Sequence, residues 1–248
     1  MLVMSQPYEL KFTKVVGSYN ALWDLSGQLV MNPKVGDHDN WLFLFRIGLR
    51  GMLARLTAVD REYVALHAFQ SAFPADGNPN EYGLGCESHV GLVLFGMDST
   101  IECLVFAMNA IGFARSPEDF RDIRDPKSLR QVNPYNILGN GKQKPIPGYQ
   151  KFFPRATAHF TLNEALLFSI CEYHDVSKHR SSVATGGAAG STHLRADPKH
   201  TGTTSSRSDT LESLARDFQE FIDTALPIVL EEIAAVFQYS VTSKPVGA

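Results

Sequence analysis

The feature that most constrains this chain is a long apolar stretch from about Ser88 to Ala114, with the sequence SHVGLVLFGMDSTIECLVFAMNAIGFA. It lacks the polar face that a helix on the surface of a protein carries. A helix that is apolar nearly all round belongs at the centre of a helical bundle. The acidic residues Glu87, Asp98 and Glu102 argue against a membrane span, because charged groups in a bilayer are costly.

Two of these carboxylates, Asp98 and Glu102, lie four residues apart and therefore on one side of the helix. A buried carboxylate needs a partner. Arg46 or Arg50 on the preceding helix is the natural candidate. We therefore interpret the two acids as members of buried ion pairs rather than as a catalytic pair.

Four further segments have helical patterns, which makes about five main helices and an all-α bundle. They are a short amphipathic segment within residues 7–35, a long one from Asn40, one that starts at the capping-box spacing of Thr161 and Glu164, and a final one that starts at Asp209 and Glu212. Pro227 should bend the final helix.

The remaining segments are irregular by composition. Residues 74–85 (PADGNPNEYGLG) read as a loop. Repeated prolines are expected to block long helices across residues 115–160, just before the next helix. Residues 184–208 are rich in Gly, Ser and Thr and indicate a flexible insertion. We expect one α-helical domain over residues 1–240 and a disordered tail over 241–248.

Composition narrows the classes of partner. A net charge of -3 gives no general attraction to nucleic acid or to an anionic membrane, so an RNA or phosphate site would be a local basic patch. Cys86, Cys103 and Cys171 sit in apolar, helix-like surroundings and are expected to be free thiols in a reducing compartment. The N-terminus has no signal-peptide pattern. We expect a cytoplasmic protein with no membrane partner.

The densest polar chemistry lies in CEYHDVSKHRSSV, residues 171–183. On a helix, Glu172, Asp175 and His179 fall within a sector of about 60°. Asp175 precedes His179 by four residues, so its carboxylate can orient that imidazole for general acid–base chemistry. His174 and Lys178 form a second polar pair, and Lys178 and Arg180 supply positive charge for phosphate. The simpler alternative is a solvated helix end with weak charge pairs.

Residues 174–179, HDVSKH, resemble the motif of the HEPN superfamily, in which Arg and then Asn, Asp or His are followed by three residues and His. The helical context, with a long final helix after the motif, is also similar to that family. The resemblance implies a HEPN-like bundle that acts as a metal-independent ribonuclease or as an inactive relative, usually a homodimer. His179 would be the general acid or base, and Asp175 would occupy the family's polar position.

The sequence departs from the pattern at His174, which stands where the motif has arginine. Histidine is shorter, cannot bind phosphate in a bidentate way and is only partly charged at neutral pH. A histidine pair with Arg180 or Lys178 as the cation remains one interpretation. The departure favours weak or lost nuclease activity, with RNA or a nucleotide bound at His174–Arg180 and no cofactor.

Two other classes remain open. A zinc-like metal site has enough ligand types but no HExxH or Cys-x-x-Cys spacing. A non-catalytic helical module could dimerise or bind a partner through the same face. The 184–208 segment could close over an anion, although a solvated spacer is favoured. The candidate metal ligands are His174, His179, His193, His200, Glu172 and Asp175.

Overall fold

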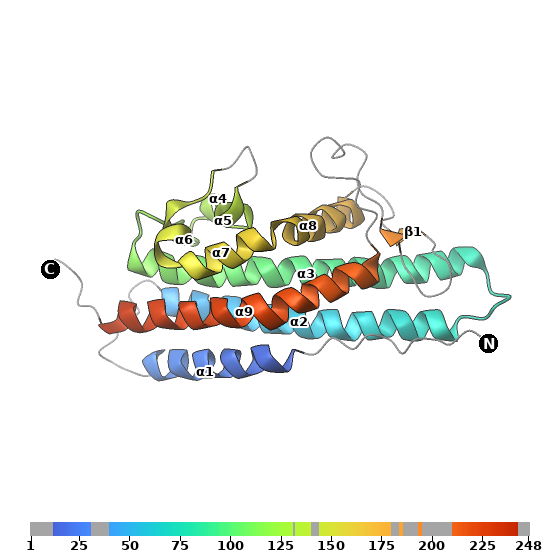
Figure 1. Ribbon diagram of the computed structural model, residues 1–248, viewed down its shortest axis with the longest axis horizontal. Coiled ribbons are helices and arrows are strands. Elements are labelled where there is room, and N and C mark those ends of the chain that lie inside the picture. The colour runs from blue at the N-terminus through green and yellow to red at the C-terminus, as the bar shows by residue number, and fades with distance from the viewer. Residues whose placement is uncertain are drawn as a thin grey trace. The chain divides into compact units, whose positions relative to one another are not determined.

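The computed structural model describes residues 12–30, 40–130, 132–139, 144–179, 184–185, 193–194 and 210–242. It confirms the all-α helical bundle (Figure 1). Five of the helices in the described part have 16 residues or more, in agreement with the expected number of main helices. The elements are α1 (Thr13–Val30), α2 (Trp41–Ala72), α3 (Pro79–Arg115), α4 (Pro126–Leu129), α5 (Tyr135–Leu138), α6 (Pro147–Phe152), α7 (Pro154–Leu162), α8 (Glu164–His179), β1 (Ala184–Thr185), β2 (His193–Leu194) and α9 (Leu211–Thr242).

The chain forms two compact units. One contains Arg55–Ser99 and Ala165–Glu220, and we name it the motif unit because the HDVSKH residues lie in it. The second unit contains Phe12–Ala54, Thr100–Glu164 and Phe221–Ala248. The helices α2, α3 and α9 each contribute residues to both units. The expected single domain over residues 1–240 stays a prediction.

The core of the motif unit is built from the buried side chains of its long helices. Consecutive turns of α2, α3, α8 and α9 supply its buried side chains. Gly96 on α3 permits a close approach to α2, since a Cβ at this position would lie 2.6 Å from Cγ2 of Val59. The buried residues include Leu56, Val59, Tyr63, Val90, Leu94, Met97, Leu167, Ile170, Leu214 and Phe218.

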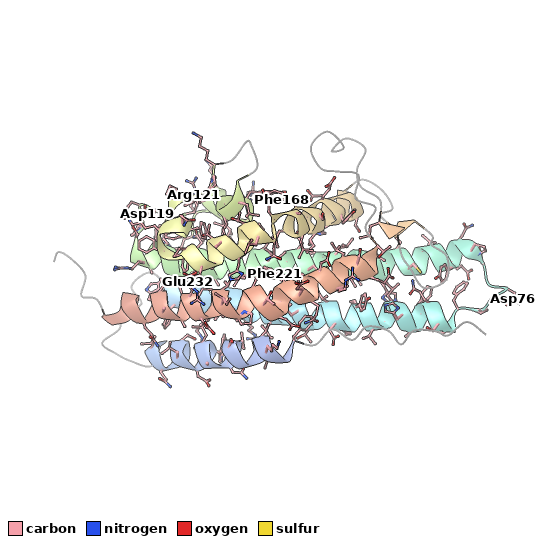
Figure 2. The ribbon with its side chains drawn as sticks, in the orientation of Figure 1. Asp76, Asp119, Arg121, Phe168, Phe221 and Glu232 are labelled. Atoms are coloured by element: carbon pink, nitrogen blue, oxygen red, sulfur yellow. The ribbon has the colours of Figure 1, made fainter. Side chains whose placement is uncertain are left out.

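A buried carboxylate of α9 organises part of the second unit. Glu232 is 8% exposed and accepts hydrogen bonds from the backbone N–H groups of Arg155, at 3.1 Å, and Ala156, at 2.7 Å (Figure 2). These amides belong to the first turn of α7, where no residue of the helix itself can pair with them. The carboxylate therefore caps α7 and also complements the positive end of its dipole.

The N-terminus of α3 corrects the prediction of a loop over residues 74–85. The helix begins at Pro79, and Asn78 caps it by accepting a hydrogen bond from the N–H of Asn80 at 3.0 Å. Proline is favoured in the first turn of a helix because its missing N–H would have no helical partner there. The Asn-Pro pair that looked like a loop signal is thus a helix start.

In residues 115–160 the described helices are short, with nine residues or fewer, as the prolines predicted. α4, α6 and α7 each begin with a proline, so Pro126, Pro147 and Pro154 start helices rather than block them. The elements at α4 and α5 are short, with four residues each. The described part of this segment therefore contains short helices, three of which begin at a proline.

Thr161 does not cap the motif helix, contrary to the prediction. It lies in the last turn of α7, and its hydroxyl donates to the carbonyl of Thr157 at 2.9 Å. α8 begins at Glu164, one residue after Asn163, which ends α7. A Thr-x-x-Glu spacing does not distinguish a helix start from a junction between two helices.

The last helix begins with a different cap from the predicted one. Thr210 and Ser213 exchange two hydrogen bonds of 3.1 Å between the side chain of one and the backbone N–H of the other. Asp209 lies outside the described residues. α9 contains Pro227 and continues to Thr242, so the predicted disordered tail is wrong for residues 241–242. Residues 243–248 lie outside the described part.

Within the insertion predicted at 184–208, the structure describes β1 and β2, which pair antiparallel with Ala184 opposite Leu194. The rest of that segment lies outside the described residues. The three cysteines are free, as expected.

Among the described helices, α3 is long and apolar enough to cross a membrane by length and composition. In the most apolar 18-residue stretch of this helix, 67% is buried inside the protein. The core helix of a bundle has the same character, so the finding is weak evidence for a span.

Candidate functional site

The motif helix α8 packs through a buried stripe that includes Leu167, Ile170 and Tyr173, and it ends at His179. The side chains of two predicted site residues, His174 and Asp175, are described. Lys178 and His179 belong to the helix, but their side chains fall outside the described part, as does Arg180 altogether. The assignments of these three residues stay predictions.

His174 is buried, with 7% exposure, and its Nδ1 lies 2.6 Å from Oδ2 of Asp98 on α3. The second oxygen of the same carboxylate accepts a hydrogen bond from Sγ of Cys171 at 3.0 Å. Asp98 is itself 6% exposed. Because a carboxylate accepts hydrogen bonds and does not donate them, the pairing places the imidazole proton on Nδ1.

These contacts correct the expected partner of Asp98. The carboxylate pairs with an imidazole and a thiol, not with Arg46 or Arg50. The guanidinium of Arg46 lies 3.9 Å from the centre of the Trp23 ring and donates to the hydroxyl of Ser26 at 3.1 Å. Glu102, the other predicted member of a buried ion pair, is exposed.

The orientation of His174 also differs from the predicted polar flank that it was to share with Lys178. His174 follows Ile170 by four residues and Leu167 by seven, so helical geometry puts all three on one face. That face is the buried one. Asp175, one residue further, is exposed. The i, i+4, i+7 spacing was the signal in the sequence that could have placed His174 inside.

Two residues that the sequence did not single out lie next to His174. The ring of Phe95 on α3 meets the imidazole edge to face, with ring centres 5.5 Å apart. The guanidinium of Arg55 on α2 lies over the ring of Phe95, 5.0 Å from the ring centre. Phe95 is 37% exposed, so this group of side chains reaches the surface of the motif unit.

A glycine sets the distance between α8 and α3 near the end of the motif helix. A Cβ added at Gly91 would lie 2.9 Å from Oγ of Ser177. This separation is shorter than real Cβ contacts, so a larger residue would have to displace the serine side chain. The glycine thus leaves room for the Ser177 hydroxyl where α8 passes α3.

Two other histidines of the motif unit have surroundings of a different kind. His67 on α2 contacts the ring of Tyr63 edge to face at 4.6 Å, and its buried Nε2 has no hydrogen-bond partner among the described residues. Burial lowers the pKa of His67, and the carboxylate of Glu212 opposes that shift. His89 lies 3.3 Å from a carboxylate oxygen of Glu62.

The metal alternative gains no geometric support from the described side chains. Among them, no group of three or more His, Cys, Asp or Glu residues is arranged to hold a metal ion. His200 and the side chains of His179 and His193 fall outside that set.

Comparison of the chain with protein-family models, with curated proteins and with solved structures finds no match. The resemblance to the HEPN superfamily therefore rests on the HDVSKH residues and on the helical context. What the site can do follows from its own chemistry. The motif unit holds an imidazole oriented by a buried carboxylate, at the start of a segment that contains a second histidine and two cations.

Proposed function

We propose that this chain is a HEPN-like protein that engages RNA or nucleotide phosphate at the His174–Arg180 segment, with weak or no metal-independent cleavage. The observation that carries the proposal is the hydrogen bond of 2.6 Å between His174 and the buried carboxylate of Asp98. An imidazole held in one tautomer and orientation is what acid–base chemistry on a phosphodiester requires.

The chemistry assigns a role to each residue of the segment. Asp98 holds Nδ1 of His174, which leaves Nε2 as the nitrogen able to accept a proton. The 2′-hydroxyl of RNA would attack the adjacent phosphorus, with one histidine accepting the hydroxyl proton and the other protonating the departing 5′-oxygen. His179 is the second histidine of this pair. Lys178 and Arg180 would balance the charge of the phosphorane.

The burial of His174 supports weak cleavage. An arginine at this position could extend a charged fork to a phosphate, whereas an imidazole that is 7% exposed and tied to Asp98 stays within the helix packing. The charge on the phosphate must then be met by Lys178 and Arg180 alone. We therefore expect binding to exceed catalysis in this protein, which we place in the cytoplasm.

The test combines binding and cleavage of labelled single-stranded RNA in EDTA. Arg180→Ala should weaken binding to every RNA sequence and lower the slope of log affinity against log salt by about 1. Arg130→Ala, which removes an exposed arginine of the second unit, is the matched control and should change neither. Any EDTA-resistant cleavage should vanish in His179→Ala. Absence of RNA binding by the wild-type protein would contradict the proposal.

A second candidate function, a non-catalytic module that forms homodimers, is favoured by exposed apolar residues on α3. Leu84 and Leu92 are eight residues apart on one face and are 73% and 47% exposed. Such side chains on a helix are suited to burial against a second copy. Light scattering should show a dimer for the wild type and a monomer for Leu92→Asp. A wild-type monomer at all concentrations would exclude this function.

A further inference from the structure

The surface next to His174 carries a pair of side chains that the proposed nuclease chemistry does not use. Arg55 and Phe95 come from different helices, α2 and α3, and meet with the guanidinium 5.0 Å from the ring centre. Arg55 is exposed, and Phe95 keeps 37% of its surface exposed. Within the described part of the chain, the contact recorded for this guanidinium is with the ring rather than with a carboxylate.

Two contacts within the motif unit position this pair. Gly96 lets α3 approach α2 closely beside Val59, which fixes the distance between the two helices that carry the pair. The Phe95 ring rests against the imidazole of His174, and that imidazole is held by Asp98. The aromatic ring therefore packs against a buried, hydrogen-bonded imidazole, and the exposed guanidinium lies over it.

We propose that Arg55 and Phe95 form a stacking site for an unpaired nucleobase of single-stranded RNA, next to the His174–Arg180 segment. A planar guanidinium supported by an aromatic ring presents a flat, cationic surface, and unpaired bases stack on such planes and on aromatic rings. The occupant is a base with its phosphate, because Arg55 also provides a positive charge that no carboxylate neutralises in the described structure.

The inference rests on the proposed function, since it assigns a base to the same RNA. The position suits a nucleotide that neighbours the bound phosphate. His174 contacts the ring of Phe95 directly, and His179 lies five residues further along α8, about 7.5 Å along the helix axis. Single-stranded RNA is therefore the substrate class, because a base in a duplex is not free to stack on protein.

The experiment measures the affinity of the full chain for two 2′-fluoro RNA octamers, one of adenosines and one with abasic positions. The 2′-fluoro group prevents cleavage, since no 2′-hydroxyl is left to attack. The wild type should bind the adenosine octamer about tenfold more tightly than the abasic one. Phe95→Leu and Arg55→Lys should each remove this difference, and Arg55→Lys should keep the salt dependence because it keeps the charge.

Val64→Ala is the matched control, because it truncates an apolar side chain of the same unit that is 46% exposed. It should leave the tenfold difference intact. A 2-aminopurine in the octamer adds a direct signature: stacking quenches its fluorescence on binding, and the quenching should be lost in Phe95→Leu.

The outcomes separate the two proposals. If both octamers bind equally well to the wild type, or if Phe95→Leu keeps the difference, the stacking site is overturned while RNA binding stands. If Arg180→Ala weakens both octamers equally and Phe95→Leu weakens only the adenosine octamer, both proposals are supported. If neither octamer binds, both are overturned.

Discussion

Asp98 and Glu232 are carboxylates on two of the long helices, and both are almost fully buried, at 6% and 8% exposure. Their partners differ. Glu232, in the second unit, accepts from two backbone N–H groups at the start of α7. Asp98, in the motif unit, is bonded to the side chains of His174 and Cys171.

The difference in partners indicates that Glu232 has a structural role, whereas Asp98 can take part in acid–base chemistry through His174. Backbone amides do not titrate, so the contacts of Glu232 can only stabilise a helix end. An imidazole can change its protonation near neutral pH, and a carboxylate beside it fixes which nitrogen is available. Burial of an acid is therefore not in itself a sign of a site, whereas the identity of its partner is.

The largest effect that would test the comparison is expected for Glu232→Ala. The variant leaves the buried N–H of Ala156 and the partly buried N–H of Arg155 without their acceptor, which should lower the free energy of unfolding by about 2 kcal/mol in urea denaturation. Glu231→Ala is the matched control, because Glu231 is exposed and its contact with Arg155 is a surface ion pair of 3.5 Å. It should cost under about 1 kcal/mol. Equal losses in the two variants would refute the capping role.

A smaller effect is expected for the pair in the motif unit. A double-mutant cycle compares the unfolding free energies of Asp98→Asn, His174→Phe and the double variant with that of the wild type. The coupling energy between the two side chains should be about 1.5 kcal/mol. In a control cycle, Glu102→Gln takes the place of Asp98→Asn, because Glu102 is an exposed acid on the same helix. This cycle should give no coupling energy with His174. Additive losses in the first cycle would show that the hydrogen bond contributes nothing to the fold.

The smallest effect concerns a histidine without such a carboxylate bond. Burial holds the pKa of His67 in the folded state below its ordinary value of 6.5, against the opposing charge of Glu212. The unfolded chain therefore binds the proton first as the pH falls, and the stability supplied by the neutral form is lost below about pH 6.5. Urea midpoints at pH 7.5 and 5.5 should differ less in His67→Gln than in the wild type. His159→Gln, with a histidine of the second unit, should retain the wild-type difference.

The sequence predicted the long helices well, because each has an apolar stripe or is apolar nearly all round. It failed where one residue type has two roles. A proline within a helix removes a backbone hydrogen bond, as Pro227 does in α9, but a proline in the first turn begins a helix, as Pro79, Pro147 and Pro154 do. The pattern alone does not show which role applies, because Ile146 and Phe153, which precede Pro147 and Pro154, make no side-chain cap hydrogen bond.

The sequence predicted the helix that carries the candidate residues, but it did not predict their contacts. The HDVSKH residues drew attention to α8, but the partner of His174 is Asp98, 76 residues away in the sequence. The sequence suggested an arginine for Asp98 because opposite charges are the simplest pairing. The rotation of α8 about its axis determines that His174 faces α3. The packing of Leu167 and Ile170 sets this rotation, and the polar residues do not.

The cap on α7 also constrains the order in which parts of the chain can fold during synthesis. Glu232 follows Ala156 by 76 residues. At 5–20 residues per second, a ribosome needs roughly 4–15 s to add them. During that interval the first amides of α7 have only water as a partner. A growing chain therefore completes this helix only after α9 has been made, and a product that stops before Glu232 would leave the start of α7 frayed.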